Sequence, residues 1–361
     1  MSRSQRHYDQ SKSKPKLYYA LIGLTFLILL LGIIAVYDAS VYEAFVDFGD
    51  KFHFARQQLI WAIAGLIIML ITSRLPTSIF KKFAIPVFLF ALLLMVLVLI
   101  PGLGQQVQGA RRWLKIGSIR LQPSELLKPA LIFYLAAWLQ EKQPLTSFLF
   151  IMFVVLGLTL IQPDLGTTVV LASAGFLIYY LSGANLSSML VIGLGGLVLG
   201  ALLILTSPYR RARLTTFLDP TQDTLGSSYH INQVLIALGS GGWSGVGLGR
   251  SRQKYRYLPE ATTDSIFAII AEETGFLGAS LIVVLLAALA VIGFRIAVQS
   301  KDSFHQLLAG GIAGWIAIQT LLNISAMAAL VPLTGIPLPL ISYGGSSLLT
   351  TLASLGILAS V

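Results

Sequence analysis

LYYALIGLTFLILLLGIIAVY, residues 17 to 37, is an apolar run of 21 residues without a single charged side chain. A bilayer core about 30 Å thick is crossed by roughly 20 apolar residues in a helix, so this run predicts a membrane-spanning helix. Nine similar runs follow, at about 57–73, 83–100, 124–139, 146–161, 167–182, 187–206, 265–294, 305–328 and 346–361.

The composition of the whole chain agrees with this pattern. Apolar residues make up 56% of the chain, charged residues 11%, and the mean hydropathy is +0.81, whereas soluble domains carry roughly a quarter charged residues. The runs are continuous and do not alternate, which excludes a transmembrane β-barrel. We therefore expect an all-α polytopic membrane protein with about ten transmembrane helices. It forms one domain over residues 17–361, after an uncleaved basic tail at residues 1–16.

The chain has no cysteine, which excludes disulfides, thiolate nucleophiles and zinc–thiolate sites. Its four histidines are scattered without the spacing of metal ligands.

The distribution of Lys and Arg predicts which side of the membrane each segment faces. With the N-terminus in the cytoplasm, the cytoplasmic segments hold eleven basic residues and the opposite side thirteen. Seven of the thirteen lie in one long loop, residues 207–264, between the seventh and eighth spans. Long loops translocate largely regardless of charge. Without that loop, the cytoplasmic segments hold eleven basic residues and the opposite side six. Because basic residues are enriched in cytoplasmic segments, this difference predicts that both termini are cytoplasmic.

Two external segments are then unusually basic: GARRWLKIGSIRLQP, residues 109–123, and the 207–264 loop. Attraction to lipid headgroups is one explanation. The other is a site for an anionic, phosphorylated substrate, because Arg offers paired donors that match phosphate. No recognition module accompanies these cations, so nucleic acid is not an expected partner. Inside the loop, SYHINQVLIALGSGG predicts an amphipathic helix lying on the membrane surface, and GGWSGVGLGR is interpreted as a flexible loop.

Several ionisable or polar residues lie inside or beside the spans. Glu125 and Lys128 share one helix face as an i, i+3 pair, which either neutralises itself or borders a polar cavity. Asp164, in QPDLGTT, is expected to cap the following helix or to form a cavity wall. Ser342 and Tyr343, in PLTGIPLPLISYGGSS, lie in a Pro- and Gly-rich connection that is a plain turn or a cavity lining.

The stretch YLPEATTDSIFAIIAEETG, residues 257–275, concentrates carboxylates where charge is costly: Glu260, Asp264, Glu272 and Glu273. Asp264 precedes an apolar helix, so it is either an N-cap or a general base at the outer membrane interface. A helix N-terminus lowers the pKa of a carboxyl group and partial burial raises it. The sequence leaves open which of the two effects is larger.

These motifs resemble the SEDS family (shape, elongation, division and sporulation), polytopic enzymes that polymerise the lipid-linked precursor of peptidoglycan. GARRWLKIG with LQPSELLK, QPDLGTT, QKYRYLPEATTDSIFAIIAEETG and PLTGIPLPLISYGGSSLL occur in the family's order. QKYRYLPEA and SYGGSSLL are more similar to the division branch, FtsW, than to the elongation branch, RodA. The family's usual His-Thr-Asp-Phe differs here, where Thr262, Thr263, Asp264 and Ser265 occupy those positions.

The resemblance implies that Asp264 is the catalytic carboxylate and that Glu125 and Lys128 form an important cavity pair. It implies transfer of the glycan from a lipid diphosphate to a GlcNAc 4-hydroxyl of lipid II, with release of undecaprenyl diphosphate. We selected further candidates for binding the diphosphate or lining the cavity by charge and position: Arg111, Arg112, Arg250, Lys254, Glu260, Ser342 and Tyr343.

A divalent cation, Mg²⁺ or Mn²⁺, with the diphosphate is a possible cofactor, without assigned ligands. Expected partners are a class B penicillin-binding protein and other membrane proteins of the division machinery. The expected location is the bacterial cytoplasmic membrane at the division septum, with the site on its outer face. A flippase or transporter for the same lipid, and a scaffold that only recruits the transpeptidase, are the alternatives.

Overall fold

The computed structural model describes residues 3–107, 110–117, 119–219, 221, 223, 226 and 228–361. Parts of the expected basic tail, of the 109–123 segment and of the 207–264 loop, including Ser227, lie outside these residues. The described chain forms twelve helices and three strands: α1 (Arg3–Phe48), α2 (His53–Arg74), α3 (Thr77–Leu97), β1 (Gly104–Val107), β2 (Ala110–Ile116), β3 (Ile119–Leu121), α4 (Pro123–Trp138), α5 (Leu145–Ile161), α6 (Leu165–Leu181), α7 (Leu186–Thr206), α8 (Pro208–Leu218), α9 (Tyr229–Gly241), α10 (Ile266–Gln299), α11 (Ser303–Met327) and α12 (Gly345–Ser360).

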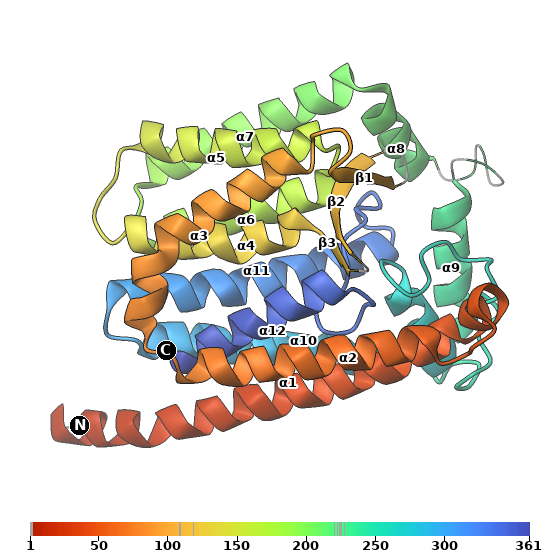
Figure 1. The fold of residues 1–361 in the computed structure, drawn as a ribbon, viewed down its shortest axis with the longest axis horizontal. Helices are drawn as coiled ribbons and strands as arrows, with labels where there is room; N and C mark the ends of the chain where they lie inside the picture. Colours follow the sequence, from red (N-terminus) through yellow and green to blue (C-terminus); the bar gives the residue numbers. More distant parts are fainter. Residues whose placement is uncertain are drawn as a thin grey trace.

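Each of the ten predicted apolar runs coincides with a helix, α1 to α7 and α10 to α12. These helices lie side by side along one direction, with both chain termini at one end (Figure 1). Helices α8 and α9 and the strands lie at the opposite end. The expected tail is not separate in secondary structure, because α1 already begins at Arg3.

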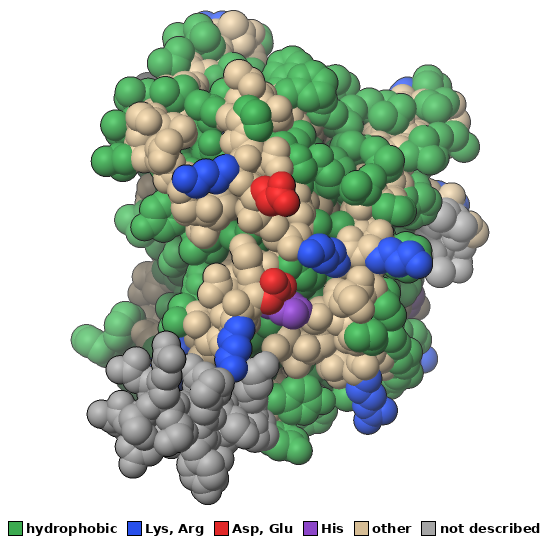
Figure 2. Space-filling view, turned by 90° about the vertical axis from the view of Figure 1, so that its left-hand side faces the viewer, with side chains coloured by type: hydrophobic (Ala, Val, Ile, Leu, Met, Phe, Trp, Pro, Cys, Tyr) green, Lys and Arg blue, Asp and Glu red, His purple; other side chains and the backbone are tan. Residues whose placement is uncertain are grey.

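Six helices are long and apolar enough to cross a membrane, and α5, α6 and α12 are shorter apolar helices. The protein is therefore an integral membrane protein. The end that carries the termini shows Lys, Arg and acidic side chains surrounded by hydrophobic ones (Figure 2). The number of crossings and the side on which the termini lie stay predictions.

Helix α11 lies at the centre of the bundle and packs against α4, α6, α10 and α12. Its most apolar window is 72% buried, whereas that of α7 is only 6% buried. Outer helices expose Leu, Ile and Phe side chains, as expected where lipid replaces water.

The all-α expectation omitted a small antiparallel sheet with the strand order β1-β2-β3. β2 and β3 are joined at Gly117, whose φ of +63° is readily adopted by glycine. Leu114 pairs with Leu121 and Lys115 with Arg120 across these two strands. The basic 109–123 segment is therefore folded as a hairpin beside the bundle, and short strands of this kind give little periodic signal in a chain dominated by apolar runs.

Helix α10 is interrupted at Gly275, which has non-helical angles of φ 67° and ψ −167°. The adjacent loop binds the backbone groups that the break leaves free. Val246 N–H donates to Glu272 O at 3.0 Å, and Phe276 N–H donates to Gly242 O at 2.8 Å. A Cβ atom on Gly275 would lie 2.3 Å from Gly245 N, so this close approach requires glycine.

The carboxylates that follow Asp264 have a structural role in the same region. Glu273 accepts hydrogen bonds from Gly249 N and Ser251 N, both at 2.9 Å, and Glu272 accepts one from Arg252 N at 3.0 Å. The glycine-rich segment predicted to be a flexible loop is thus fixed to α10 by carboxylate and carbonyl acceptors.

The predicted amphipathic helix is present as α9, and its buried face includes Ile231, Val234 and Ala237. It packs against α10 and α11. Leu235 and Ile236 on the same helix stay 39% and 53% exposed, so protein covers only part of its apolar surface, and its position at the membrane surface stays a prediction.

Candidate active site

A cavity of about 600 Å³ opens at the end of the bundle opposite the chain termini. It is lined from many parts of the chain: Arg112 from β2, Glu125 from α4, Asp164 at the start of α6, Arg213 from α8, His230 from α9, Glu260 and Asp264 before α10, and Thr334, Gly335 and Tyr343 before α12. Five of the ten predicted site residues line it: Arg112, Glu125, Glu260, Asp264 and Tyr343.

Asp264 precedes α10 but does not cap it. The N-cap residue is Ser265, and no side chain makes a capping hydrogen bond there. The described residues donate no hydrogen bond to the Asp264 carboxylate. Its Oδ2 lies 3.5 Å from the position that a Cβ of Gly335 would occupy. The N-cap interpretation is wrong, and the carboxylate is half-buried in the cavity wall.

The backbone around Asp264 is held by the segment that precedes α12. Asn323 Nδ2 donates to Asp264 O at 2.8 Å and to Ile336 O at 2.7 Å, which joins the two segments. Ser342 Oγ donates to Thr263 O at 2.6 Å, and Tyr343 N–H donates to Thr262 O at 2.9 Å. Ser342 therefore fixes the backbone beside Asp264 and does not line the cavity.

Electrostatics favour Asp264 as a proton acceptor near neutral pH. Burial is the largest effect, and together with the negative charges of Glu260 and Asp164 it raises the pKa of Asp264 from 3.8 to about 7. Arg213 and Arg112 act in the opposite direction. The structure thus decides the question that the sequence left open, because burial prevails over the effects that favour the ionised form.

Two arginines line the same cavity from different elements, Arg112 from β2 and Arg213 from α8. Arg112 Nε donates to Gln162 O at 3.0 Å, and its Nη2 donates to Pro163 O. Arg213 Nη1 donates to Leu333 O at 2.8 Å. These bonds fix both guanidinium groups in the cavity lining. The sequence analysis counted Arg213 among the basic residues of the loop without selecting it. Arg210, Arg211 and Arg213 all lie on α8, and of these three only Arg213 lines the cavity.

Asp164, expected as a helix cap or a cavity wall, and His230, which the sequence did not single out, also line the cavity. Asp164 caps α6 as predicted, since its Oδ1 accepts from Thr167 N at 3.1 Å, and it also lines the cavity. His230 Nε2 lies 2.8 Å from Ser265 Oγ. Burial lowers the pKa of His230, which favours the neutral imidazole.

Glu125 and Lys128 form the predicted pair at 2.8 Å, with side chains 3% and 2% exposed. Lys128 Nζ also donates to Gln319 Oε1 at 2.9 Å, and Trp315 Nε1 donates to the same oxygen at 2.8 Å. Glu125 lines the cavity, whereas Lys128 lies behind it in the bundle. The pair therefore supports the floor of the cavity.

Three predicted diphosphate ligands do not line the cavity. Lys254 lies in a buried ion cluster, 2.9 Å from Asp38 and 2.9 Å from Glu273, so its charge is already matched by carboxylates. Arg250 is exposed near Gly247. Arg111 precedes Arg112 on β2, where successive side chains point to opposite faces.

A dedicated metal cage is not among the described residues, because they hold no group of three His, Cys, Asp or Glu side chains placed to bind an ion. Mg²⁺ often uses one or two carboxylates together with substrate phosphates. Asp264 or Glu260 fits that limited contribution.

Comparisons with known proteins agree with the geometry. A family model described as "Cell cycle protein", which combines FtsW, RodA and SpoVE, matches residues 19–361. Stage V sporulation protein E of Bacillus subtilis (strain 168) is 42% identical over 358 residues, which cover 97% of each chain. The probable peptidoglycan glycosyltransferase FtsW of Trichlorobacter lovleyi is 39% identical over 338 residues, 91% of this chain and 89% of the relative.

Solved structures give the same result for the fold. One matching structure is described as "Structural coordination of polymerization and crosslinking by a peptidoglycan synthase complex". The match has a TM-score of 0.79 at 28% identity, and it covers 95% of this chain and 96% of the matched chain. The rod shape determining protein RodA of Thermus thermophilus has a TM-score of 0.70 at 27% identity, with 94% and 95% coverage. The predicted resemblance to the SEDS family is confirmed, and the chain belongs to the family of FtsW, RodA and SpoVE.

Proposed function

We propose that this chain is a peptidoglycan glycosyltransferase that polymerises lipid II into β-1,4 glycan strands. The observation that carries the proposal is the Asp264 carboxylate, which lies in the wall of a polar cavity with its pKa raised to about 7. Relatives of this chain are named peptidoglycan glycosyltransferases. A carboxylate with this pKa takes a proton at neutral pH far better than an ordinary Asp does.

The reaction follows from the placement of these groups. The Asp264 carboxylate takes the proton of the acceptor GlcNAc 4-hydroxyl while the hydroxyl oxygen bonds to the anomeric carbon of the donor chain. The bond from that carbon to the diphosphate oxygen breaks, and its electron pair leaves with undecaprenyl diphosphate. Arg112 and Arg213 stabilise the developing negative charge, since fixed positive charge acts most strongly where charge develops. A Mg²⁺ or Mn²⁺ ion bound mainly by the diphosphate would add to this stabilisation.

We also propose a partner and a location. A class B penicillin-binding protein is the proposed partner, supported by the similarity to a peptidoglycan synthase complex. Other division membrane proteins are proposed around it, in the cytoplasmic membrane at the septum with the cavity on the outer face. A fluorescent fusion that gathers at mid-cell would agree with this, and labelling confined to the side wall would favour the elongation role.

Replacement of Asp264 tests the proposed chemistry. Asp264→Asn keeps the size of the side chain but cannot take the proton, so we expect a folded chain that makes no glycan from purified lipid II. Asp302→Asn is the matched control, because Asp302 precedes α11 and lies outside the cavity lining. Glycan would be resolved on gels with and without the transpeptidase. A full glycan ladder from Asp264→Asn would contradict the assignment of the base.

A further inference from the structure

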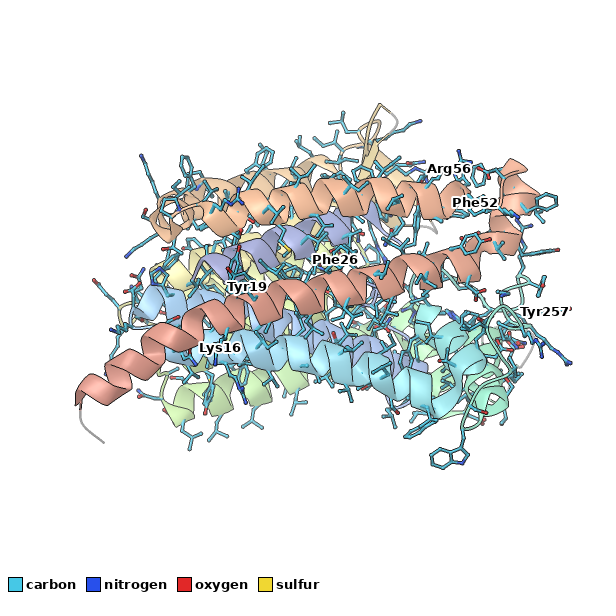
Figure 3. The ribbon with its side chains drawn as sticks, turned by 90° about the horizontal axis from the view of Figure 1, so that it is seen from below. Lys16, Tyr19, Phe26, Phe52, Arg56 and Tyr257 are labelled. Atoms are coloured by element: carbon cyan, nitrogen blue, oxygen red, sulfur yellow. The ribbon has the colours of Figure 1, made fainter. Side chains whose placement is uncertain are left out.

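A second hollow, of about 700 Å³, shares no lining residue with the Asp264 cavity. Its volume is within the range of small-molecule sites. We call it the tyrosine pocket; its walls include Tyr42 from α1, Gln233 from α9, and Arg252, Gln253, Tyr255 and Tyr257 from the loop before α10. Tyr257 lies at the end of the molecule that carries Phe52 and Arg56, opposite Lys16 (Figure 3).

The lining of the tyrosine pocket suits a carbohydrate. The rings of Tyr42 and Tyr255 meet edge to face with centroids 4.9 Å apart. Tyr255 and Tyr257 are 48% and 57% exposed, which leaves ring surface for a ligand. A tyrosine ring is apolar on its face and polar at its hydroxyl. A pyranose ring combines C–H faces with hydroxyls in the same way, and the described lining contains amides and a guanidinium group but no carboxylate.

Gln253 gives a second, independent indication of a ligand. It is only 6% exposed and lines the pocket, yet its Oε1 atom has no hydrogen-bond partner among the described residues. Buried acceptors are rarely left unpaired. The neighbouring backbone fixes its place, since Arg252 N–H donates to Glu272 Oε1 at 3.0 Å and Leu258 N–H donates to Gln253 O at 3.0 Å. The Oε1 atom itself is enclosed, so a hydroxyl donor in the pocket would satisfy it once the amide group turns toward the pocket.

The tyrosine pocket adjoins the Asp264 cavity along two parts of the chain. Tyr257 lines the pocket and Pro259, two residues further, lines the cavity. Two residues span at most about 7 Å. On α9, His230 lines the cavity and Gln233, about one helical turn away, lines the pocket. A polymer that leaves the cavity past His230 and Pro259 therefore reaches the tyrosine pocket first.

We propose that the tyrosine pocket is a carbohydrate subsite that holds the β-1,4 glycan strand after it leaves the Asp264 cavity. This inference rests on the proposed polymerase function and adds a site that retains the product between additions. Exposed tyrosines also occur as membrane-interface anchors. The polar lining of Gln233, Arg252 and Gln253 favours the glycan, because an aromatic anchor alone would not need these amide and guanidinium groups beside the rings.

The test measures glycan length separately from catalysis. In the full-length protein, Tyr255→Ala, Tyr257→Ala and Gln253→Met would be compared with Tyr180→Ala, a control whose tyrosine is 60% exposed on α6 and lines neither hollow. We expect the initial rate of lipid II consumption to stay within about twofold of the unmodified chain. Gel-resolved strands should become several times shorter in the pocket variants and not in the control.

A direct binding measurement completes the test. An oligosaccharide of β-1,4-linked N-acetylglucosamine would be titrated into Asp264→Asn protein, with and without each pocket substitution. Loss of one aromatic contact should weaken binding roughly two- to tenfold. Unchanged strand length and unchanged binding in Tyr255→Ala and Tyr257→Ala would overturn the proposal. Reduced copurification of the transpeptidase at unchanged strand length would also overturn it in favour of a protein interface. If no chain polymerises lipid II, the proposed function fails, and the binding arm still decides the subsite.

Discussion

The pH dependence of the reaction is the most direct test of Asp264 as the base. With a pKa of about 7, only about a tenth of the free protein carries the ionised carboxylate at pH 6, about half at pH 7 and about nine tenths at pH 8. An Asp with an ordinary pKa of about 3.9 would be ionised throughout this range. We therefore expect kcat/KM for lipid II to rise about tenfold from pH 6 to pH 8.

A charge change near Asp264 should move this profile. Glu260→Gln removes the negative charge that, after burial, most raises the pKa of Asp264, so the midpoint should move to lower pH and the rate at pH 6 should increase. Glu141→Gln is the matched control, on an exposed loop that does not line the cavity. Initial rates with fluorescent lipid II would be measured from pH 5.5 to 8.5. A flat profile in the unmodified chain, or an unmoved midpoint in Glu260→Gln, would refute the assignment.

Four further predictions concern stability and substrate affinity. Asp264→Asn should raise the midpoint of thermal unfolding more at pH 8 than at pH 5. The pKa of Asp264 is about 7 in the folded chain and 3.8 in the unfolded chain, so the unfolded chain loses this proton at lower pH than the folded chain does. The resulting loss of folding free energy grows between pH 5 and pH 8 to about 4 kcal/mol, and Asn, which does not ionise, avoids it. Lys128→Ala should lower the free energy of unfolding by roughly 3–5 kcal/mol, as it leaves the buried Glu125 charge unpaired, and a loss below about 1 kcal/mol would contradict this. Lys254→Met should be strongly destabilising while Arg250→Met changes stability by less than about 0.5 kcal/mol, both measured by thermal unfolding in detergent. Arg213→Ala should weaken lipid II binding in an equilibrium assay with Asp264→Asn protein, and unchanged affinity would exclude its proposed role.

The helices were predictable because each depends on a local property, the length of an apolar run. The pair Glu125 and Lys128 was predictable for a related reason, since charges inside such runs are rare and stand out. The i, i+3 spacing indicated that these two side chains meet, whereas the sequence left Asp264 open between an N-cap and a general base.

The remaining features depend on partners far along the chain. Lys254 was misassigned because its partners, Asp38 and Glu273, lie 216 and 19 residues away and nothing local indicates that its charge is matched. The break at Gly275 was hidden for the same reason, since the groups that satisfy it come from the loop at residues 242–247. Arg213 differs from its basic neighbours only in the direction it faces, which packing determines.

The anchoring of residues 262–264 also has a consequence for biogenesis. Their hydrogen-bond donors, Asn323, Ser342 and Tyr343, are synthesised well after them, Asn323 59 residues after Asp264. A nascent polypeptide therefore cannot fix the backbone at Asp264 until the segments that carry α11 and α12 have also been inserted, and translation itself delays the completion of the cavity wall.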